Sequence, residues 1–336
     1  MEEVLFSVII PTVKFNKYLD EAIQSCFDSG VQATIVVWVN NCSYSGFEQS
    51  DFYKSSNVQW MCIGKNTVPM FESWNAAIAN TKSEWCFLLS DDDLLIKGFL
   101  EGVDLERLNK RTLYASTINI INEDSEYLRG SIQLPKSNYE SNEAIELYFK
   151  NRFHHHLSLF VFSREMFNIC GGFVFTGYPN GYYLDTVFHG KLLAECDGMI
   201  VAHKPVFSRR EFIQQASAGF YFSDVSEYFD IICLRLFENE KFKIQAVKRF
   251  GSITRYKKDL MQHRFYTEWY KLNNNVFNTS FKDKVSFFKN VFWGWELGGV
   301  FKIKSVFRLL FISVKSTLPE GVLLKCRRCL KSLTKW

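Results

Sequence analysis

Glu84-Trp-Cys-Phe-Leu-Leu-Ser-Asp-Asp-Asp-Leu-Leu95 runs from an apolar stretch directly into three aspartates. The uninterrupted apolar run Trp85–Leu89 predicts a buried strand, so the three carboxylates would stand at its end. Adjacent negative charges raise one another's pKa, and a divalent cation relieves that repulsion. Mg²⁺ and Mn²⁺ prefer carboxylate and phosphate oxygens. A bare acidic run is also typical of a solvated turn or a helix N-cap, so its place in the fold has to decide between the two interpretations.

On both sides of this run, short apolar segments alternate with segments of helical spacing. The expected strands are Phe6–Ile10, Thr34–Val39, Val58–Ile63 and Trp85–Leu89, and the expected helices are Tyr18–Asp28 and Val68–Asn80. This alternation predicts an α/β fold with a mostly parallel sheet flanked by helices. From about residue 223 onward the sequence is mainly helical, aromatic and basic in character.

Polar residues follow three of the expected strands, at Pro11-Thr12, at Asn40-Asn41 and at Asp91-Asp92-Asp93. In open parallel sheets, ligands bind in the crevice beyond the carboxyl ends of the strands. We therefore expect the three polar groups to converge on one crevice, which favours a functional role for the aspartates.

Four motifs, in order and properly spaced over residues 6–95, carry a family resemblance. They are Phe6-Ser-Val-Ile-Ile-Pro-Thr12, Val39-Asn-Asn-Cys-Ser-Tyr-Ser45, Phe71-Glu-Ser-Trp-Asn-Ala-Ala77 and the acidic run quoted above. Together they resemble the family 2 glycosyltransferases, which have the GT-A fold of nucleotide-diphospho-sugar transferases. The resemblance implies a metal-dependent transfer of a hexose from a nucleotide-diphosphate donor, with Mn²⁺ or Mg²⁺ as cofactor and a UDP-sugar favoured.

The same resemblance implies roles for single residues. Pro11 and Thr12 would border the nucleotide base, and Asn40 or Asn41 would meet it where many members carry an aspartate. An amide can still hydrogen-bond a uracil edge.

Further implied roles belong to residues of the helix and of the acidic run. Asn75 would lie near the diphosphate or the acidic loop. Asp91 would contact ribose or metal, and Asp93 or Asp92 would ligate metal. Because three aspartates are consecutive, the register of the motif is open by one residue.

Asp185 is the candidate catalytic base, again from the resemblance. In inverting members, an acidic residue after a Gly-Gly-Phe segment takes the proton of the acceptor hydroxyl, and here Gly171-Gly172-Phe173 precedes Asp185. Such a base must lie within hydrogen-bond reach of the acceptor. The alternative is that Asp185 is only the N-cap of a helix over Thr186–Ala194.

Two clusters of side chains allow more than one interpretation. Arg209 and Arg210 resemble the family's basic segment and would bind diphosphate oxygens, or they would form a solvated turn. His154-His155-His156 cannot all reach one ion from a regular strand or helix. We therefore interpret the histidines as a polar strand start, with contact to donor or acceptor sugar as the alternative.

The charge of the chain is unevenly distributed. Residues 282–336 hold 12 Lys and Arg against three acidic residues, in a chain whose formal net charge is +4. A basic amphipathic end of this kind favours an anionic membrane surface as partner, and nucleic acid less so. We expect a catalytic domain over residues 1–222 and a helical, basic, membrane-associating region over residues 223–336. A helix that packs on the domain with a solvated basic face is the alternative.

The cysteines and the hydropathy of the chain indicate its cellular location. Nine cysteines without regular spacing predict reduced thiols. We find no basic leader before the first strand and no apolar stretch long enough to cross a bilayer. We expect a cytoplasmic protein, peripheral at the inner face of the membrane.

The expected function is therefore an inverting glycosyltransferase acting on a saccharide or lipid-linked saccharide in surface polysaccharide synthesis. A non-catalytic GT-A-fold binding protein is a second interpretation, supported by the absence of second-strand aspartates. A nucleotidyltransferase is a third, and the lack of glycine in the loop after the first strand, Pro11–Phe15, opposes it.

Overall fold

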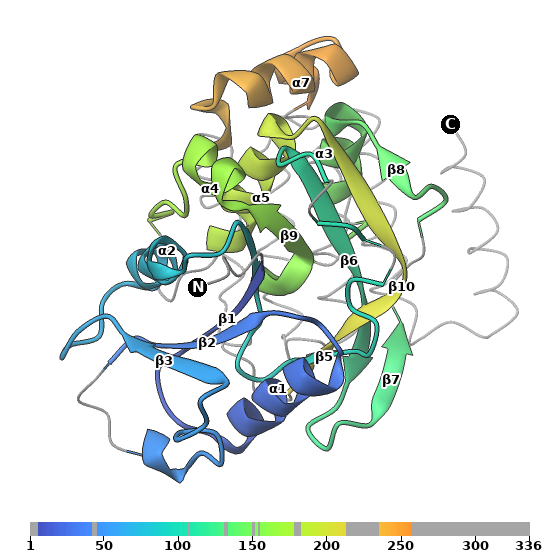
Figure 1. Cartoon of the computed structure of the whole chain (residues 1–336). Coiled ribbons are helices and arrows are strands. Elements are labelled where there is room, and N and C mark those ends of the chain that lie inside the picture. The colour runs from blue at the N-terminus through green and yellow to red at the C-terminus, as the bar shows by residue number, and fades with distance from the viewer. Residues whose placement is uncertain are drawn as a thin grey trace, which may run out of the picture. The chain divides into compact units, whose positions relative to one another are not determined.

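A computed structural model describes residues 6–41, 46–101, 103–105, 108–130, 134–149, 152–153, 155–177, 183–212 and 235–256 (Figure 1). The chain divides into two compact units, Met1–Phe220 with Glu227–Ile253, and Tyr221–Ser226 with Thr254–Trp336. The described elements belong almost wholly to the first unit. Apart from residues 235–256, the expected helical, basic region of residues 223–336 lies outside the described residues.

Four parallel strands form one half of the sheet, as the apolar runs predict. They are β1 (Phe6–Thr12), β2 (Thr34–Val39), β3 (Val58–Cys62) and β4 (Trp85–Leu88), in the order β3-β2-β1-β4. Each of these pairs is parallel. The carboxyl ends of β1, β2 and β4 therefore lie at one edge.

Helices α1 (Lys17–Asp28) and α2 (Met70–Asn80) cover opposite faces of this half. Side chains alternate across a strand, and Val8 and Val37 pack with α1 in one buried cluster. Trp38, on the other face, donates its indole N–H to Ser73 of α2 at 3.1 Å. The flanking helices expected from the 3–4 spacing are confirmed.

The other half of the sheet is mixed in direction. The strands here are β5 (Leu94–Leu95), β6 (Thr112–Ile121), β7 (Tyr127–Gly130), β8 (Asn138–Tyr139), β9 (Phe160–Ser163) and β10 (Gly198–Arg210). β9 runs antiparallel between β4 and β6, whereas β10 runs parallel to β6. β5, directly after the three aspartates, pairs antiparallel with the end of β10. This last pairing brings residues 209–210 to the acidic run.

The remaining helices are α3 (Ser141–Phe149), α4 (Arg164–Cys170), α5 (Leu184–Glu195) and α7 (Glu240–Phe250), with short 3₁₀ turns η1 (Phe47–Gln49) and η2 (Leu157–Leu159). α3, α5 and α7 contact one another, and α7 buries Phe242 and Ala246. Among the described helices, none is both long and apolar enough to cross a membrane.

The described cysteines do not all fit the expectation of reduced thiols. Cys26, Cys86, Cys170 and Cys196 are free and buried, in agreement with the prediction. Cys62, however, is disulfide-bonded. Local apolar pattern could not reveal this bond, because a half-exposed strand residue and a disulfide partner look alike in one sequence.

Candidate active site

The ends of β1 and β4 meet at Asp91, the first residue of the acidic run. Thr12, the last residue of β1, donates its hydroxyl to Asp91 Oδ2 at 2.6 Å. Asn16, the N-cap of α1, approaches the same oxygen through its amide N–H at 3.4 Å. Because Asn16 also accepts the N–H groups of Tyr18 and Leu19, the start of α1 fixes the donors around Asp91.

Asp93, the last of the three aspartates, is 1% exposed. Its Oδ1 accepts the backbone N–H of Arg210 at 2.9 Å, a bond that follows from the pairing of β5 with β10. Its Oδ2 accepts no hydrogen bond from the residues that the structure describes, although Nε2 of His156 lies 3.3 Å away. The acidic run is therefore built into the sheet edge and is not a solvated turn.

Burial makes negative charge on this run costly. Burial, with a smaller contribution from the charge of Asp92, raises the pKa of Asp91 to about 6 against the opposing hydrogen bond from the Thr12 hydroxyl. Burial also raises the pKa of Asp92, against the opposing charges of Arg210 and Arg209. For Asp93, burial and then Asp92 hold the pKa well above its usual range. Such a cluster is stabilised by a bound cation.

Arg210 is a buried structural cation. Its side chain is 0% exposed, and Nη2 bonds Glu21 on α1 at 2.7 Å. Its Nη1 bonds the Ser125 hydroxyl at 2.9 Å, and Nε bonds the carbonyl of Asp92 at 2.9 Å. The guanidinium also lies over the ring of Tyr18, 4.4 Å from its centroid.

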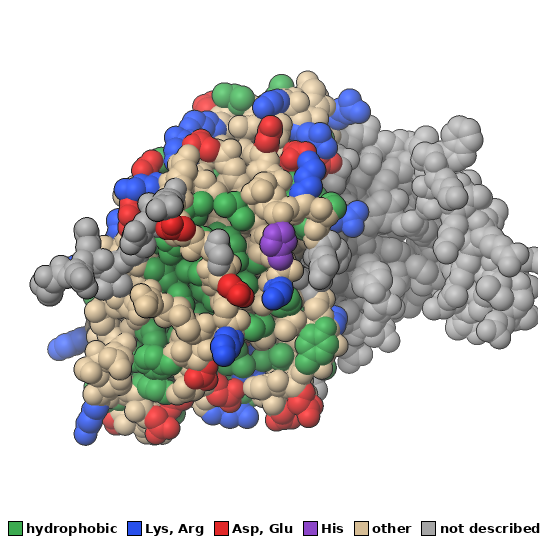
Figure 2. All heavy atoms as spheres, turned by 45° about the vertical axis from the view of Figure 1, so that its right-hand side comes forward, with side chains coloured by type: hydrophobic (Ala, Val, Ile, Leu, Met, Phe, Trp, Pro, Cys, Tyr) green, Lys and Arg blue, Asp and Glu red, His purple; other side chains and the backbone are tan. Residues whose placement is uncertain are grey.

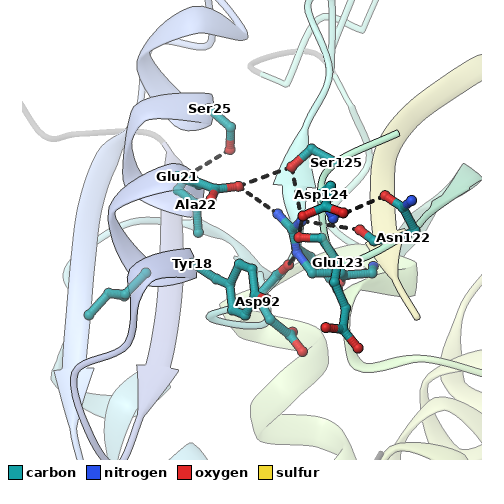
Figure 3. Close-up of polar contacts among 12 residues, drawn as sticks. Tyr18, Glu21, Ala22, Ser25, Asp92, Asn122, Glu123, Asp124 and Ser125 are labelled. Carbon is teal, nitrogen blue, oxygen red and sulfur yellow. Dashed lines mark hydrogen bonds and ion pairs between the residues drawn. The ribbon is translucent and has the colours of Figure 1, made fainter. Parts of the chain in front are cut away.

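Figure 3 shows that the residues around this guanidinium come from separate parts of the chain: Tyr18 and Glu21 from α1, Asp92 from the acidic run, and Asn122, Glu123 and Ser125 from the turn after β6. The carbonyls of Asn122 and Glu123 add bonds of 3.2 and 3.0 Å to Nη1. Since most of its donors are already used, Arg210 holds the acidic loop and is not placed to reach a diphosphate.

Arg209 remains a candidate diphosphate ligand. It is partly exposed, and its charge acts on Asp92, Asp93 and Asp185 together. The expected base and the acidic run are therefore within electrostatic reach of the same guanidinium.

Asp185 lies in the first turn of α5 but is not its N-cap. The cap position is Tyr183, which has a left-handed backbone with φ of 64°. Asp185 Oδ1 accepts the N–H of Thr186 at 2.7 Å. Burial raises the pKa of Asp185, while the bonds from Thr186 and the charge of Arg209 oppose that rise. A raised pKa suits a base that has to hold a proton during turnover.

Asn75 is positioned to shape the loop before α5. Its Nδ2 donates to the carbonyl of Phe173 at 2.8 Å, and its Oδ1 accepts the N–H of Phe173 at 2.8 Å. A Cβ on Gly172, whose φ is +67°, would lie 2.5 Å from that Oδ1. Position 172 is a glycine because a larger side chain would collide with Asn75. The bonds from Asn75 to Phe173 join α2 to the segment that leads toward Asp185.

The second-strand asparagines do not behave alike. Asn40 is buried, and its amide exchanges two hydrogen bonds with the backbone of Val68, at 3.0 and 3.1 Å. Asn40 therefore holds the loop before α2. Asn41 is more exposed and follows the strand end, while Pro11 pairs in register with Trp38. Of the two, Asn41 is better placed to meet a ligand.

The carboxylates fit a hard divalent cation. Mg²⁺ is held in such sites by one or two carboxylates together with substrate phosphates. Asp93 Oδ2 is a buried carboxylate oxygen without a hydrogen bond among the described residues, and Asp91 lies two residues away. Within the same described residues, no group of three His, Cys, Asp or Glu forms a complete cage, so any cation there would rely on substrate oxygens.

Sequence reasoning missed several residues of this site. His156 was interpreted as a polar strand start, yet it faces Asp93. Glu21, Asn122 and Ser125 contact Arg210 from elements far apart in sequence. The hydrophobic periodicity of a helix cannot reveal which distant residues it contacts. The partners of Arg210 are brought together only by the pairing of β10 with β5 and β6.

On the face drawn in Figure 2, the surface of the described residues is neither mainly acidic nor mainly basic. Acidic and basic side chains mix along its upper and lower margins, and hydrophobic side chains occupy much of the middle. The basic excess of residues 282–336 lies outside the described residues.

This fold and the polar edge beyond β1 and β4 define an α/β protein of the GT-A type, with a largely parallel sheet flanked by helices. Solved structures of S. aureus TarS share it. TarS 1–349 matches with a TM-score of 0.60 and 11% identity, over 98% of this chain and 91% of that chain. The same fragment matches in complex with UDP-GlcNAc at a TM-score of 0.58 and 11% identity, with the same coverage of both chains.

A third structure, TarS 1–349 in complex with UDP, matches at a TM-score of 0.55 and 12% identity, over 96% of this chain and 87% of that chain. No protein-family model and no curated protein sequence matches the chain. At this identity the likeness establishes the fold.

Proposed function

We propose that this protein is a glycosyltransferase of the family 2 type that transfers a sugar from a nucleotide-diphosphate donor with inversion. The observation that carries the proposal is the bond from Thr12 at the end of β1 to Asp91 at the end of β4, 2.6 Å long. It unites two polar strand ends at the edge where open α/β sheets bind ligands.

UDP-sugar is the favoured donor. Two structures of the same fold are complexes of TarS with UDP-GlcNAc and with UDP. In this chain, the Asn41 side chain and the strand end at Pro11 and Thr12 would line the place for the base. Asn41 offers both a donor and an acceptor, which suits a uracil edge.

Each remaining group has a task in the proposed reaction. A Mn²⁺ or Mg²⁺ ion held by Asp91 and Asp93 would supply positive charge for the departing diphosphate. Arg209 would add donors on the same side. Asp185 would accept the proton of the acceptor hydroxyl while that oxygen attacks the anomeric carbon. Arg210 and Asn75 would hold the acidic loop and the Gly171–Phe173 segment in place.

The acceptor and the location rest on sequence. A saccharide or lipid-linked saccharide of a surface polysaccharide is the proposed acceptor, because the basic residues 282–336 favour an anionic membrane. The proposed location is the cytoplasm, peripheral to the inner face of that membrane, with no nucleic acid as partner.

The test is calorimetry of the full chain with UDP, GDP, CMP and dTDP, each with Mn²⁺ and with EDTA. We expect UDP to bind with Mn²⁺ and to weaken strongly with EDTA, and Asp93→Ala to abolish the metal-dependent part. The proposal fails if no nucleotide binds better with metal. That result would favour a non-catalytic GT-A-fold protein, which the commitment of Asn40 to the Val68 backbone already supports.

A further inference from the structure

We propose that His156 is a positioning residue of the acidic run, holding the carboxylate of Asp93 through its Nε2–H. The inference rests on the proposed function, because it assigns His156 to the cation and diphosphate end of that site. Two separate contacts support it, one from His156 to Asp93 and one from Ser158 to Ser90 at the start of the acidic loop.

The first contact is direct. His156 Nε2 lies 3.3 Å from Asp93 Oδ2, the oxygen that accepts no hydrogen bond from the described residues. The histidine side chain is 17% exposed and that of Asp93 1%, so the contact is shielded from water. The imidazole also stacks on Phe207 of β10, with ring centroids 5.7 Å apart, which limits its rotation.

The second contact acts through Ser158. The hydroxyl of this buried serine accepts the backbone N–H of Ser90 at 3.2 Å. Ser90 immediately precedes the three aspartates. The turn that carries His156 is therefore anchored to both ends of the acidic run, at Ser90 and at Asp93.

The hydrogen bonds of the ring decide what His156 does. Its Nδ1 accepts the backbone N–H of Ser158 at 3.2 Å, as the side chain caps η2. A neutral imidazole whose Nδ1 is an acceptor carries its proton on Nε2. Nε2 then presents an N–H to Asp93 and has no lone pair for a metal ion. This tautomer assigns His156 to orienting the carboxylate, and not to ligating the cation.

Asp93 is consequently placed between two donors. The backbone N–H of Arg210 bonds Oδ1, and the ring N–H of His156 faces Oδ2. The hydrogen bond from β10 and the close approach of the ring from the turn before β9 would hold the carboxylate from two sides. Outer partners of this kind change metal affinity by about 10- to 100-fold when they are removed.

The test compares His156→Asn with His156→Gln. Asparagine is a good N-cap, so it keeps the bond from Ser158 but is too short to reach Asp93. Glutamine is long enough to place an amide N–H where Nε2 stood. The measurement is the dissociation constant of UDP by calorimetry, with saturating Mn²⁺ and with EDTA, together with the melting temperature of each unliganded variant.

We expect His156→Asn to weaken UDP binding about 10- to 100-fold with Mn²⁺, with no change in EDTA and with a melting temperature like that of wild type. We expect His156→Gln to regain most of the lost affinity. His155→Gln is the matched control, because His155 stacks on Tyr148 and bonds its carbonyl at 2.8 Å, away from Asp93.

Two results would overturn the inference. In one, His156→Asn binds UDP with Mn²⁺ as wild type does. In the other, His156→Gln loses as much affinity as His156→Asn, so that a donor at that position is not what matters. The wild-type protein tests the proposed function: without metal-dependent UDP binding by wild type, both the proposed function and this inference fail. If wild type binds UDP with metal and only the variants behave otherwise than expected, this inference alone fails.

Discussion

At the residue scale, the first turn of α5 holds Asp185, the proposed base, where burial raises its pKa. Replacing it by Asn removes the proton acceptor and keeps the shape, so we expect Asp185→Asn to lower kcat about 10²- to 10⁴-fold and to leave UDP affinity unchanged. Steady-state kinetics and calorimetry measure the two effects. Asp197→Asn is the control, since that carboxylate is 54% exposed and contacts Arg111 and Asn109. Normal turnover of Asp185→Asn would remove the base assignment.

The pH profile of the same reaction tests the environment of Asp185. Burial raises its pKa above the ordinary 3.8, and a base works only when it is deprotonated. The acid limb of kcat is therefore expected above pH 3.8, with activity lost as pH falls through that limb. An acid limb at or below pH 3.8 would contradict the buried environment.

Arg210 offers a stability test at the same scale. Arg210→Met removes a guanidinium that is 0% exposed and that donates to the part-buried carbonyls of Asp92, Asn122 and Glu123. Hydrogen bonds to charged groups contribute about 1.5–3 kcal/mol each. We expect a loss of at least about 3 kcal/mol in urea unfolding. Arg129→Met is the control, because Arg129 is 57% exposed in its ion pair with Glu211 and such pairs contribute about 0–1 kcal/mol. Equal losses in both variants would contradict the structural role.

The sequence indicated some of these residues and not others. A local pattern indicates Asp91–Asp93, because acidic residues after an apolar run are costly without a partner. Asp185 is expected only from the family resemblance. Arg209 and Arg210 are adjacent and chemically identical in the sequence. Only β10, which turns one side chain inward to Glu21 and leaves the other partly exposed, separates their roles.

At the element scale, the segment after α4 begins with two adjacent glycines of positive φ, Gly171 and Gly172. A Cβ on Gly171 has open space, whereas one on Gly172 would strike Asn75 Oδ1 at 2.5 Å. We expect Gly171→Ala to cost about 1–2 kcal/mol for the left-handed backbone, and Gly172→Ala to cost about 1–3 kcal/mol more for overpacking. Chemical unfolding measures both.

A double mutant sharpens the comparison. Asn75→Ala removes the atom that Gly172→Ala would strike, so the two substitutions together should cost less than the sum of their separate losses. Additive losses would show that Asn75 and Gly172 do not interact. Turnover should fall with Gly172→Ala more than with Gly171→Ala, because the displaced segment leads to α5.

The elements themselves were predicted unevenly. β2, β3 and β4 agree with the apolar runs to within one residue, and β1 extends two residues beyond its run. The helices begin and end close to their expected bounds. The reversed direction of β9 was not predicted. An apolar run has the same pattern in parallel and antiparallel pairing, and the direction depends on a partner about 75 residues earlier in the chain, as Trp85 pairs with Ser163.

At the scale of the whole molecule, buried titratable groups set the response to acid. Burial lowers the pKa of His189 to about 3, with a smaller contribution from His155, whereas an unfolded histidine titrates near 6.5. The unfolded chain therefore binds the proton first. Stability from neutral His189 is full above about pH 6.5 and is lost as pH falls toward 3, by up to about 1.4 kcal/mol per pH unit.

His189→Asn tests this slope. Burial raises the pKa of Asp91 and Asp185, and these groups act in the opposite direction on acidification. Because wild type and variant share these aspartates, their contributions cancel when the pH dependences of the two proteins are subtracted. Urea midpoints at pH 7 and pH 5 should fall further for wild type than for His189→Asn. Equal shifts would mean that His189 is solvated or charged in the native state.

The pairing of β10 also determines how late during synthesis the acidic loop can fold. Asp93 emerges from a ribosome long before the residue whose N–H it accepts, since Arg210 follows 117 residues later. Until that strand arrives, β5 has no partner and the guanidinium that holds the loop does not exist. A nascent chain thus carries the three carboxylates in an unassembled form through most of the synthesis of this unit. The proposed nucleotide site would therefore be completed only after β10, the last long strand described in the sheet, has been synthesised.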